Sequence, residues 1–487
     1  MKKFYVTTAI DYVNAEPHIG HAYQKVIADV LARWHKLKGE DVFFLTGTDE
    51  HGQKISRSAE SAGLKPQEFV NKIAKKFEES WKLLNIDYSK FIRTTNPEHK
   101  KLVQEFILKI QKDIYKGIYE GLYCIGCEAY ITEKDLVDGK CPFHPNREPE
   151  SIKEETYFFR LSKYQDKLLE LYKKNPDYIL PRKRSREIIN RVKDGLKDLS
   201  ITRTNFSWGI PYTQDKNHVI YVWFDALLNY ITALSWPESK FKKYWPADVE
   251  LLGVDNAWFH CVIWPAMLFS AGIEPAKSIF VHGFLTFNGR KISKSLGNSI
   301  SPKYLIEKYN SDSLRYFICR NFVFGEDGDF SEDVLKERIN NELANDLGNL
   351  LSRVLTLVEK NFNNINKKVI EKNLGSKLDV KKIDELMLEY KINEALNEIW
   401  KFINGCNKYI NQERLWELKG KYLEKHLYSL LESIRIIAIL LEPFIPETSE
   451  KINKQLNIKA GSLKDCKFGL IKKYKVKKGE ILFKKIK

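Results

Sequence analysis

The stretch that decides the fold is residues 4–45, which read FYVTTAIDYVNAEPHIGHAYQKVIADVLARWHKLKGEDVFFL. Residues 4–10 alternate β-branched and aromatic side chains with others, which predicts a strand. Residues 18–37 place apolar side chains at helical spacing, and residues 42–45 form a second apolar run. A strand, a helix and a strand in this order form a βαβ unit, so the sequence predicts an α/β fold with a parallel sheet.

After this unit, the residue composition and the hydrophobic pattern of the sequence change twice. Residues 118–149 are rich in turn residues, cysteines and charges, which is typical of an insertion. Strand and helix signals return over residues 218–330, and then residues 341–359 and 415–441 carry long amphipathic helical patterns. The chain is therefore predicted to continue into an all-α helix bundle, and a strand-like run at 481–483 closes it.

The composition excludes several classes of protein. Among the 487 residues, 43% are hydrophobic and 30% are charged, which excludes wholesale disorder. The most apolar run, 434–441, is far shorter than the roughly 20 residues of a membrane-spanning helix, so we expect no membrane contact. The net charge of +16 favours an acidic partner, and residues 451–487 contain thirteen lysines against two acids.

The first candidate for chemistry is His18-Ile19-Gly20-His21, where the first strand meets its helix. A helix N-terminus has free N–H groups and attracts phosphate. Gly20 lets a ligand approach the backbone, and two imidazoles can donate to phosphate oxygens. By itself the tetrapeptide is a weak signal, because two histidines on the surface of an ordinary helix would give the same pattern.

The second candidate is a loop at residues 291–295, which read KISKS and lie between Gly289 and Gly297. Lys291 and Lys294 in a loop of small residues suit a mobile clamp on a polyphosphate. By itself, such a loop is more often a solvated basic loop.

Together, residues 18–21 and 291–295 resemble the two signatures of class I aminoacyl-tRNA synthetases. Residues 46–52 (TGTDEHG), 221–226 (YVWFDA) and 264–268 (WPAML) are similar to methionyl-tRNA synthetases, and the resemblance covers essentially the whole chain. It implies a Rossmann-type catalytic domain that activates L-methionine with ATP and Mg²⁺ to methionyl-adenylate and pyrophosphate. The methionine then passes to the 3′ end of tRNA.

A cysteine and histidine cluster lies in the insertion. Cys124 and Cys127 form one pair with a two-residue spacing, and Cys141 and His144 form another. Two such pairs can converge on one tetrahedral ion, so the spacing predicts one closed, structural Zn²⁺ site. Unliganded thiols or an iron–sulfur site are the alternatives. The resemblance agrees, since relatives of bacterial type carry a zinc knuckle here, and such cysteine usage favours a reducing, cytoplasmic setting.

The resemblance also implies roles for individual residues. The catalytic residues would be His18, His21, Lys291 and Lys294, and ATP would also contact Gly20, Gly253 and Asp255. The methionine pocket would be formed by Ala9, Ile10, Tyr12, Asp49, Trp223, Tyr230, Asn256 and His260. Asp49 would pair with the ammonium group, and aromatic rings suit the polarisable thioether. Without the resemblance, Trp223 and Tyr230 would be expected to be core aromatics.

In the helical part, Asn349 and Arg353 stand at i and i+4 and share a helix face. Trp416 follows at the predicted start of another helix. In relatives the matching residues read the anticodon CAU, since a Trp stacks an unpaired base while Asn and Arg bond to base edges. The implied partner is therefore tRNA with this anticodon, initiator and elongator. Otherwise Trp416 would be a packing residue and Arg353 a solvated charge.

The expected division of the chain has six segments. They are the catalytic halves 1–115 and 216–285, the connective insertion with the zinc knuckle 116–215, the lysine loop and stem-contact region 286–334, the anticodon-binding bundle 335–465 and a C-terminal segment folding back, 466–487. We expect the chain to lack the β-barrel tRNA-binding module that some relatives carry. We also expect a monomer, and a separate tRNA-binding subunit stays open.

Two departures from the family pattern and three alternatives remain. Ile292 replaces the usual Met of the lysine loop, which should be tolerated, and Asn256 would put an amide near the methionine side chain. A synthetase for leucine, isoleucine or valine would need a large editing domain, and one for cysteine would need zinc in its pocket. A tRNA-independent HxGH nucleotidyltransferase would not explain the anticodon residues. An inactive relative would not explain the intact histidines and lysines.

Overall fold

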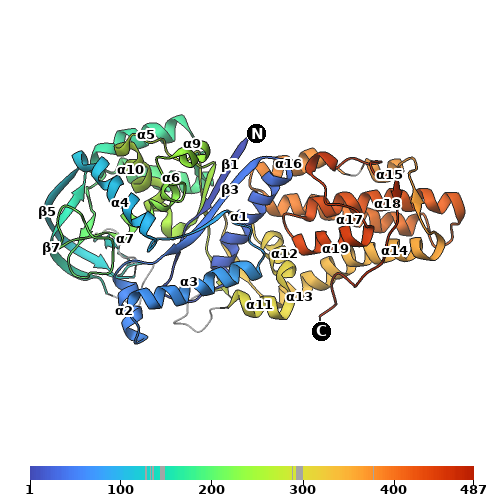
Figure 1. Cartoon of the computed structure of the whole chain (residues 1–487), viewed down its shortest axis with the longest axis horizontal. Coiled ribbons are helices and arrows are strands. Elements are labelled where there is room, and N and C mark those ends of the chain that lie inside the picture. The colour runs from blue at the N-terminus through green and yellow to red at the C-terminus, as the bar shows by residue number, and fades with distance from the viewer. Residues whose placement is uncertain are drawn as a thin grey trace.

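A computed structural model describes residues 1–126, 129–131, 133, 136–142, 148–287, 289–291, 300–376 and 378–486. It has a sheet-based lobe, on the left of Figure 1, and a lobe of long helices on the right. The predictions for Cys127, His144 and Lys294 lie outside the described residues, and Lys291 is described by its backbone alone.

A seven-stranded parallel sheet organises the first lobe. The strands are β1 (Lys3–Thr8), β2 (Asp11–Tyr12), β3 (Asp41–Asp49), β4 (Lys90–Arg93), β8 (Ile179–Leu180), β12 (Val249–Gly253) and β13 (Ile279–His282). They run in the order β2, β3, β1, β12, β13, β8, and β4 pairs with β3. Because β1 pairs with β3 on one side and with β12 on the other, a crevice opens at its carboxyl end. The predicted parallel α/β fold is confirmed.

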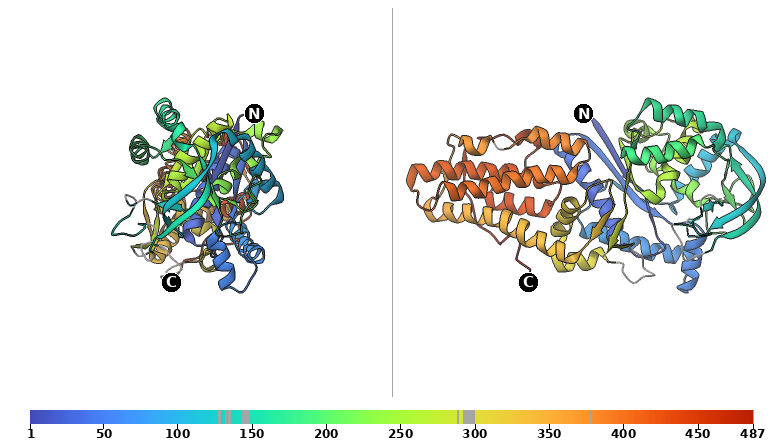
Figure 2. Two further views of the ribbon diagram at one scale, coloured as in Figure 1. Left: turned by 90° about the vertical axis from the view of Figure 1, so that its left-hand side faces the viewer. Right: turned by 180° about the vertical axis from the view of Figure 1, so that it is seen from behind.

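The insertion is a second, antiparallel sheet with two helices. Its strands, in the order β6, β5, β7, β9, are β6 (Ala129–Ile131), β5 (Ile114–Cys124), β7 (Glu150–Phe159) and β9 (Leu199–Ser200). Helices α5 (Gln165–Lys174) and α6 (Arg182–Lys193) follow β7. Seen from behind in Figure 2, the β5–β7 hairpin forms the end of the molecule opposite the helical lobe. Strand β5 pairs with β7 from Ile114 onward, so the antiparallel sheet begins before the change in composition at residue 118.

Further helices and short strands complete the first lobe. The helices are α2 (Gln53–Ser61), α3 (Pro66–Leu83), α4 (Pro97–Lys109), α7 (Val222–Ala226), α8 (Asn229–Thr232), α9 (Ser239–Tyr244), α10 (Trp264–Ala271), α11 (Pro302–Tyr309), α12 (Ser311–Asn321) and α13 (Glu332–Arg338). The strands are β10 (Thr202–Arg203), β11 (Val219–Ile220), β14 (Leu285–Phe287), β15 (Arg290–Lys291) and β16 (Gly328–Phe330). Strand β15 pairs with β14, which places the backbone of Lys291 at the edge of a small sheet.

The second lobe is helical, as predicted. After a π-helical stretch at Ile339–Gly348, its helices are α14 (Asn349–Asn361), α15 (Lys372–Gly375), α16 (Val380–Leu388), α17 (Ile392–Gln412), α18 (Gly420–Leu441) and α19 (Pro446–Leu456). The last turns of α18 are apolar and buried on all sides, which places this helix in the centre of the bundle. None of the described helices has the length and apolarity that crossing a membrane requires.

The C-terminal segment differs from the prediction. Among the described residues it forms one strand, β18 (Lys473–Tyr474), which pairs with β17 (Ile365–Asn366), and the strand expected at 481–483 is wrong. Leu482 and Phe483 are buried in the bundle without a ladder partner, so their apolar character reflects packing rather than pairing. The segment folds back over the helical lobe and ends beside its first turns, where Ile486 N donates to Asn340 at 2.7 Å.

Helix α1 (Ile19–Leu37) joins the two lobes. It starts at the sheet crevice and ends against the helical lobe, where Trp34 Nε1 donates to Asp384 Oδ1 at 2.9 Å. Arg33 bonds to Asp29 at 2.8 Å and to Glu442 at 2.7 Å. Arg315, fully buried, bonds to the same Asp29 at 2.7 Å and donates to backbone carbonyls at the end of α18. One helix therefore spans from the crevice to the second lobe.

Candidate active site

A cavity of about 690 Å³ opens where β1, β3, β12 and β13 end. Every residue predicted for the methionine pocket lines it: Ala9, Ile10, Tyr12, Asp49, Trp223, Tyr230, Asn256 and His260. The described residues predicted to bind ATP line it too: His18, Gly20, His21, Gly253 and Asp255. Segments that are far apart in the sequence thus meet at one cavity, which is large enough for a small ligand.

His18 and His21 are held by the first turn of α1. His18 is the N-cap, and its Nδ1 accepts from Gly20 N at 3.1 Å. Nδ1 of His21 accepts from His18 N at 3.1 Å, so the two rings form a reciprocal cap and lie 3.8 Å apart. Because each Nδ1 accepts a backbone hydrogen, each neutral ring carries its proton on Nε2.

Burial keeps both imidazoles neutral. It lowers the pKa of His18 to about 4, and it lowers the pKa of His21 well below its usual value, with the neighbouring His18 as a smaller cause. At neutral pH the cavity therefore contains two Nε2–H donors at the N-terminus of a helix. Such donors can hydrogen-bond to an anion, and the start of the helix adds its free N–H groups.

Two glycines keep this region open. A Cβ on Gly20 would lie 3.0 Å from the His18 ring, and a Cβ on Gly253 would lie 2.7 Å from Asp255 Oδ1. Contacts this short would displace the side chains beside them. Both glycines are therefore needed for the observed positions of His18 and Asp255.

The aromatic side of the cavity is ordered by a hydrogen-bonded histidine. Nδ1–H of His260 donates to Asn256 O at 3.0 Å, and Nε2 accepts from Tyr230 O–H at 2.7 Å. Burial lowers the pKa of His260 to about 4, so the ring stays neutral. Asn256 thus supports the pocket through its backbone carbonyl. Trp223 stacks on Phe259 with ring centroids 3.9 Å apart and planes 3° apart.

Sequence reasoning missed several residues in and below the cavity. Phe259 is one, and Gln24 is another, since its Nε2 donates to Leu251 O at 3.1 Å and lies 3.3 Å from His282 Nε2. Lys25, fully buried, pairs with Asp11 at 2.7 Å. The signal was available, because Gln24 and Lys25 lie three and four residues after His21 and so share its side of the helix.

A buried pair of histidines joins two parts of the pocket wall. His51 Nδ1 lies 2.6 Å from Asp225 Oδ2, and His99 Nε2 lies 2.7 Å from Asp225 Oδ1. Burial alone would raise the pKa of Asp225, but the two histidines lower it overall. His51 follows Asp49 by two residues and Asp225 follows Trp223 by two, so this cluster fixes the Asp49 strand end against the Trp223 helix.

The predicted metal ligands are described in part. Cys124, at the end of β5, and Cys141 are both buried, as thiols that ligate a structural ion are. Cys141 also lines the large cavity. Thiolates from two separate turns fit the predicted zinc set in chemistry, and its other two members, Cys127 and His144, lie outside the described residues.

The predicted anticodon residues lie on the surface of the helical lobe. Asn349 and Arg353 share α14, and Arg353 donates to Asn411 Oδ1 of α17 at 2.6 Å. Trp416 is 56% exposed, which excludes the alternative of a packing residue. It lies in the turn between α17 and α18 rather than at a helix start, because Arg414 takes a left-handed conformation (φ 46°) and α18 begins only at Gly420.

Comparison with known families agrees with this fold and cavity. The family described as "tRNA synthetases class I (M)" matches residues 4–148 and 143–355, and the "Anticodon-binding domain of tRNA ligase" matches residues 377–484. The fold, the cavity and these matches define a class I aminoacyl-tRNA synthetase.

Individual relatives narrow the class. A methionine–tRNA ligase of Caldanaerobacter subterraneus subsp. tengcongensis is 48% identical over all of this chain and 79% of its own length, and one of Thermotoga maritima is 46% identical over 99% and 80%. Methionyl-tRNA synthetase of Mycobacterium tuberculosis, solved in complex with methionyl-adenylate, has a TM-score of 0.95 at 38% identity and covers 99% of this chain. The chain belongs to the methionyl-tRNA synthetase family, and its activity is that of a methionine–tRNA ligase.

Proposed function

We propose that both steps of methionine–tRNA ligation take place in the 690 Å³ cavity, with the residue roles set out below. One observation carries this proposal. The same cavity is lined by the two neutral Nε2–H donors of His18 and His21 and by the aromatic pocket around Tyr230. A charged triphosphate and an apolar amino acid can therefore be bound side by side.

In the first step, a carboxylate oxygen of methionine forms a bond to the α-phosphorus of ATP, and the bond to pyrophosphate breaks. Negative charge on the phosphate oxygens is met by the Nε2–H groups of His18 and His21 at the start of α1. Asp255 would accept from the ribose hydroxyls. Lys291 and Lys294 would hold the leaving pyrophosphate, together with the Mg²⁺ that accompanies ATP.

Methionine would be held at both of its ends. Asp49 would pair with the ammonium group, while Trp223 and Tyr230 would surround the thioether. Because His260 uses both ring nitrogens within the protein, it would fix the Tyr230 ring rather than bond to the ligand itself. In the second step, the terminal ribose hydroxyl of tRNA attacks the activated carbonyl carbon and AMP leaves.

We infer that the tRNA is the one with anticodon CAU. Exposed Trp416 would stack on an unpaired base, and Asn349 and Arg353 would bond to base edges. Arg353 would exchange its bond to Asn411 for one to RNA. The enzyme would act as a cytoplasmic monomer, and one Zn²⁺ would be held by Cys124, Cys127, Cys141 and His144.

Pyrophosphate exchange tests the proposal directly. Exchange into ATP should be stimulated by methionine and by none of the other standard amino acids. Stimulation by leucine or cysteine, without methionine, would contradict it. Charging should then favour CAU transcripts over the same tRNA with another anticodon.

Metal analysis tests the zinc assignment separately. The purified chain should contain one zinc per molecule, and Cys124→Ser should lower that ratio. Cys406→Ser, which changes a buried thiol of α17, should leave it at one. A wild-type ratio well below one would refute the zinc site without affecting the rest of the proposal.

A further inference from the structure

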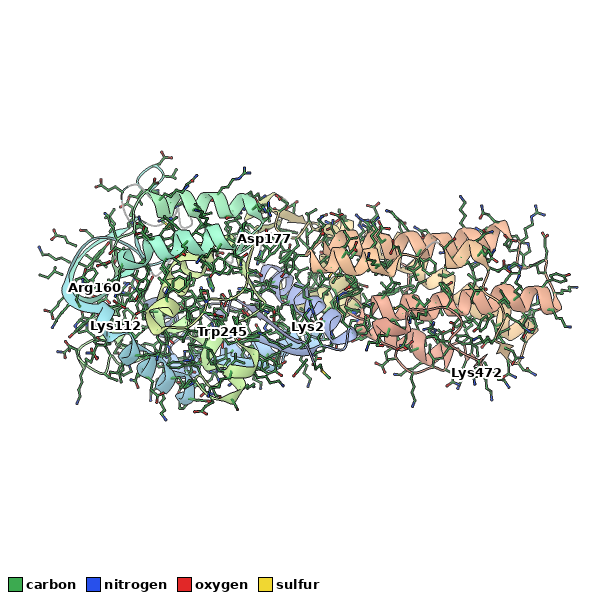
Figure 3. The ribbon with its side chains drawn as sticks, turned by 90° about the horizontal axis from the view of Figure 1, so that it is seen from above. Lys2, Lys112, Arg160, Asp177, Trp245 and Lys472 are labelled. Atoms are coloured by element: carbon green, nitrogen blue, oxygen red, sulfur yellow. The ribbon has the colours of Figure 1, made fainter. Side chains whose placement is uncertain are left out.

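The C-terminal segment has an unusual surface. We define the basic ribbon as residues 459–485, which contain ten lysines against Asp465 and Glu480. All ten lysines are exposed. The ribbon lies on the helical lobe, and Figure 3 shows its Lys472 there, whereas Lys112 lies in the sheet lobe.

A buried ion pair holds the ribbon in place. Glu432 and Arg435 of α18 pair at 3.0 Å and are 0% and 4% exposed. Arg435 donates to the backbone carbonyls of Asp465 and Lys467, and Glu432 accepts from the N–H groups of Gly469 and Leu470. Because the bonds go to the backbone, the path of the ribbon is fixed while its lysine side chains stay in solvent.

Around strand β18, the side chains of the ribbon point alternately into the bundle and into solvent. Tyr474 is buried and donates to Glu432 Oε1 at 2.5 Å. Since successive side chains of a strand point to opposite faces, Lys473 and Lys475 are turned outward. Lys367 N donates to Lys472 O at 2.8 Å, so a further exposed lysine from β17's end adds to the same edge.

The ribbon also reaches the helix that carries the predicted anticodon residues. Lys478 N donates to Glu359 Oε1 at 2.9 Å, and its Nζ donates to Thr356 Oγ1 at 2.8 Å. Thr356 lies three residues after Arg353 on α14, so the two are neighbours on the helix surface. A molecule bound at Arg353 would therefore lie within reach of the ribbon.

The charges of the ribbon are not compensated within the protein. Across the described part of the chain, no ribbon lysine forms an ion pair with a carboxylate, whereas bundle lysines such as Lys382 and Lys401 share Glu398. A fixed row of like charges repels itself and gains from a flexible or extended polyanion. RNA fits this better than a membrane surface, because the ribbon has no continuous apolar face: Leu482 and Phe483 are buried, and the exposed Leu470 and Ile481 lie eleven residues apart.

We propose that the basic ribbon is a second tRNA contact, which holds the phosphate backbone beside the anticodon residues without reading bases. The proposal rests on the proposed function, since the RNA is the tRNA of that reaction. Lysine suits the role because its ammonium is a point charge that bonds to phosphate in many geometries.

The test compares two triple variants. Lys472→Gln/Lys473→Gln/Lys475→Gln removes the centre of the ribbon, and the control Lys101→Gln/Lys109→Gln/Lys112→Gln removes three exposed lysines of the sheet lobe. Binding of a CAU tRNA and of the same tRNA with another anticodon is measured between 50 and 200 mM salt. Thermal melting checks that both variants fold.

The ribbon variant should bind both tRNAs about tenfold more weakly at low salt. The slope of log K against log salt should become shallower by about two, which is the value for three lost phosphate contacts. The control triple should retain the wild-type slope. An unchanged slope in the ribbon variant, or an equal loss in the control, would overturn the proposal.

Two further outcomes separate the alternatives. If wild-type chain but not the ribbon variant binds vesicles of phosphatidylcholine with one-third phosphatidylserine, while tRNA binding is equal in both, the ribbon is a membrane contact and the proposal is wrong. Methionine-dependent pyrophosphate exchange needs no tRNA. Its failure would refute the proposed function, whereas an unchanged salt slope with normal exchange would refute the ribbon alone.

Discussion

The cavity of the sheet lobe and the outer face of the helical lobe handle charge in opposite ways. In the cavity, His18 and His21 are buried and neutral, and the charged pair of Lys25 and Asp11 is enclosed. On the outer face, Trp416 and the lysines of the basic ribbon are exposed to solvent. In a buried site, ligand binding depends on a few individual hydrogen bonds, and salt screens the electrostatic interactions little. On an exposed surface, binding is the sum of many weak electrostatic contacts, which salt screens strongly.

The largest effect is expected inside the cavity. His21→Ala removes one Nε2–H donor and the cap on His18 N, so methionine-dependent exchange should fall by about 10²–10³-fold. The loss should be the same at 50 and 200 mM salt. His426→Gln, which changes a histidine beside Tyr409 in the helical lobe, should keep the wild-type rate. Undiminished exchange in a folded His21→Ala enzyme would remove His21 from the mechanism.

A smaller effect is expected on the outer face. Trp416→Ala removes one exposed stacking surface, so the ratio of CAU-tRNA charging to exchange should fall about 10- to 100-fold, as for the loss of one stacked base. Tyr422→Ala changes an even more exposed aromatic at the start of α18, so it is the control and should change the ratio little. Equal losses in both variants would show that exposed aromatic area, rather than a specific stack, matters.

The smallest effect concerns stability rather than activity. Glu250 on β12 is fully buried and accepts from Trp264 Nε1 at 3.1 Å, and burial raises its pKa from 4.5 to about 8. In the unfolded chain this carboxyl ionises near pH 4.5, so its contribution to stability is lost progressively as pH rises from 4.5 to 8.

Glu250→Gln keeps the shape and the acceptor but has no proton to lose. The free energy of unfolding should therefore rise by a few kcal/mol at pH 8 and stay nearly unchanged at pH 4.5. Urea titrations at both pH values measure this. Glu337→Gln, an exposed carboxyl of α13, should alter neither value. A gain of equal size at both pH values would mean that ionisation is not the cause.

Local sequence patterns predicted those helices and strands whose formation is determined by residues close together in the sequence. Helix α1 begins where the motif predicted, because His18 is both a motif residue and the N-cap. The strand predicted at residues 4–10 is present as β1, because β-branched and aromatic side chains in a short run are a local signal for a strand. The predicted cavity residues came from the resemblance to the family, and some of them, such as Asp49 and Gly253, lie at strand ends.

Long-range pairing could not be predicted in this way. Nothing local indicates that β12 inserts between β1 and β13, or that Phe259 stacks on Trp223. Leu482 and Phe483 were misassigned because burial by packing and burial by strand pairing leave the same apolar signal. Trp416 was placed in a helix because the left-handed Arg414 has no signature in a single sequence.

The helix that joins the lobes has a consequence for how the chain comes apart. A fragment lacking the second lobe would expose Trp34, and Arg315 would keep its ion pair with Asp29 but lose its bonds to the carbonyls of Pro443 and Phe444. Buried hydrogen-bonding groups that lose their partners are destabilising. We therefore expect the two lobes to melt in a single cooperative transition, with no stable catalytic fragment. The anticodon-binding half then supports the active site structurally, although all described residues that line the cavity belong to the sheet lobe.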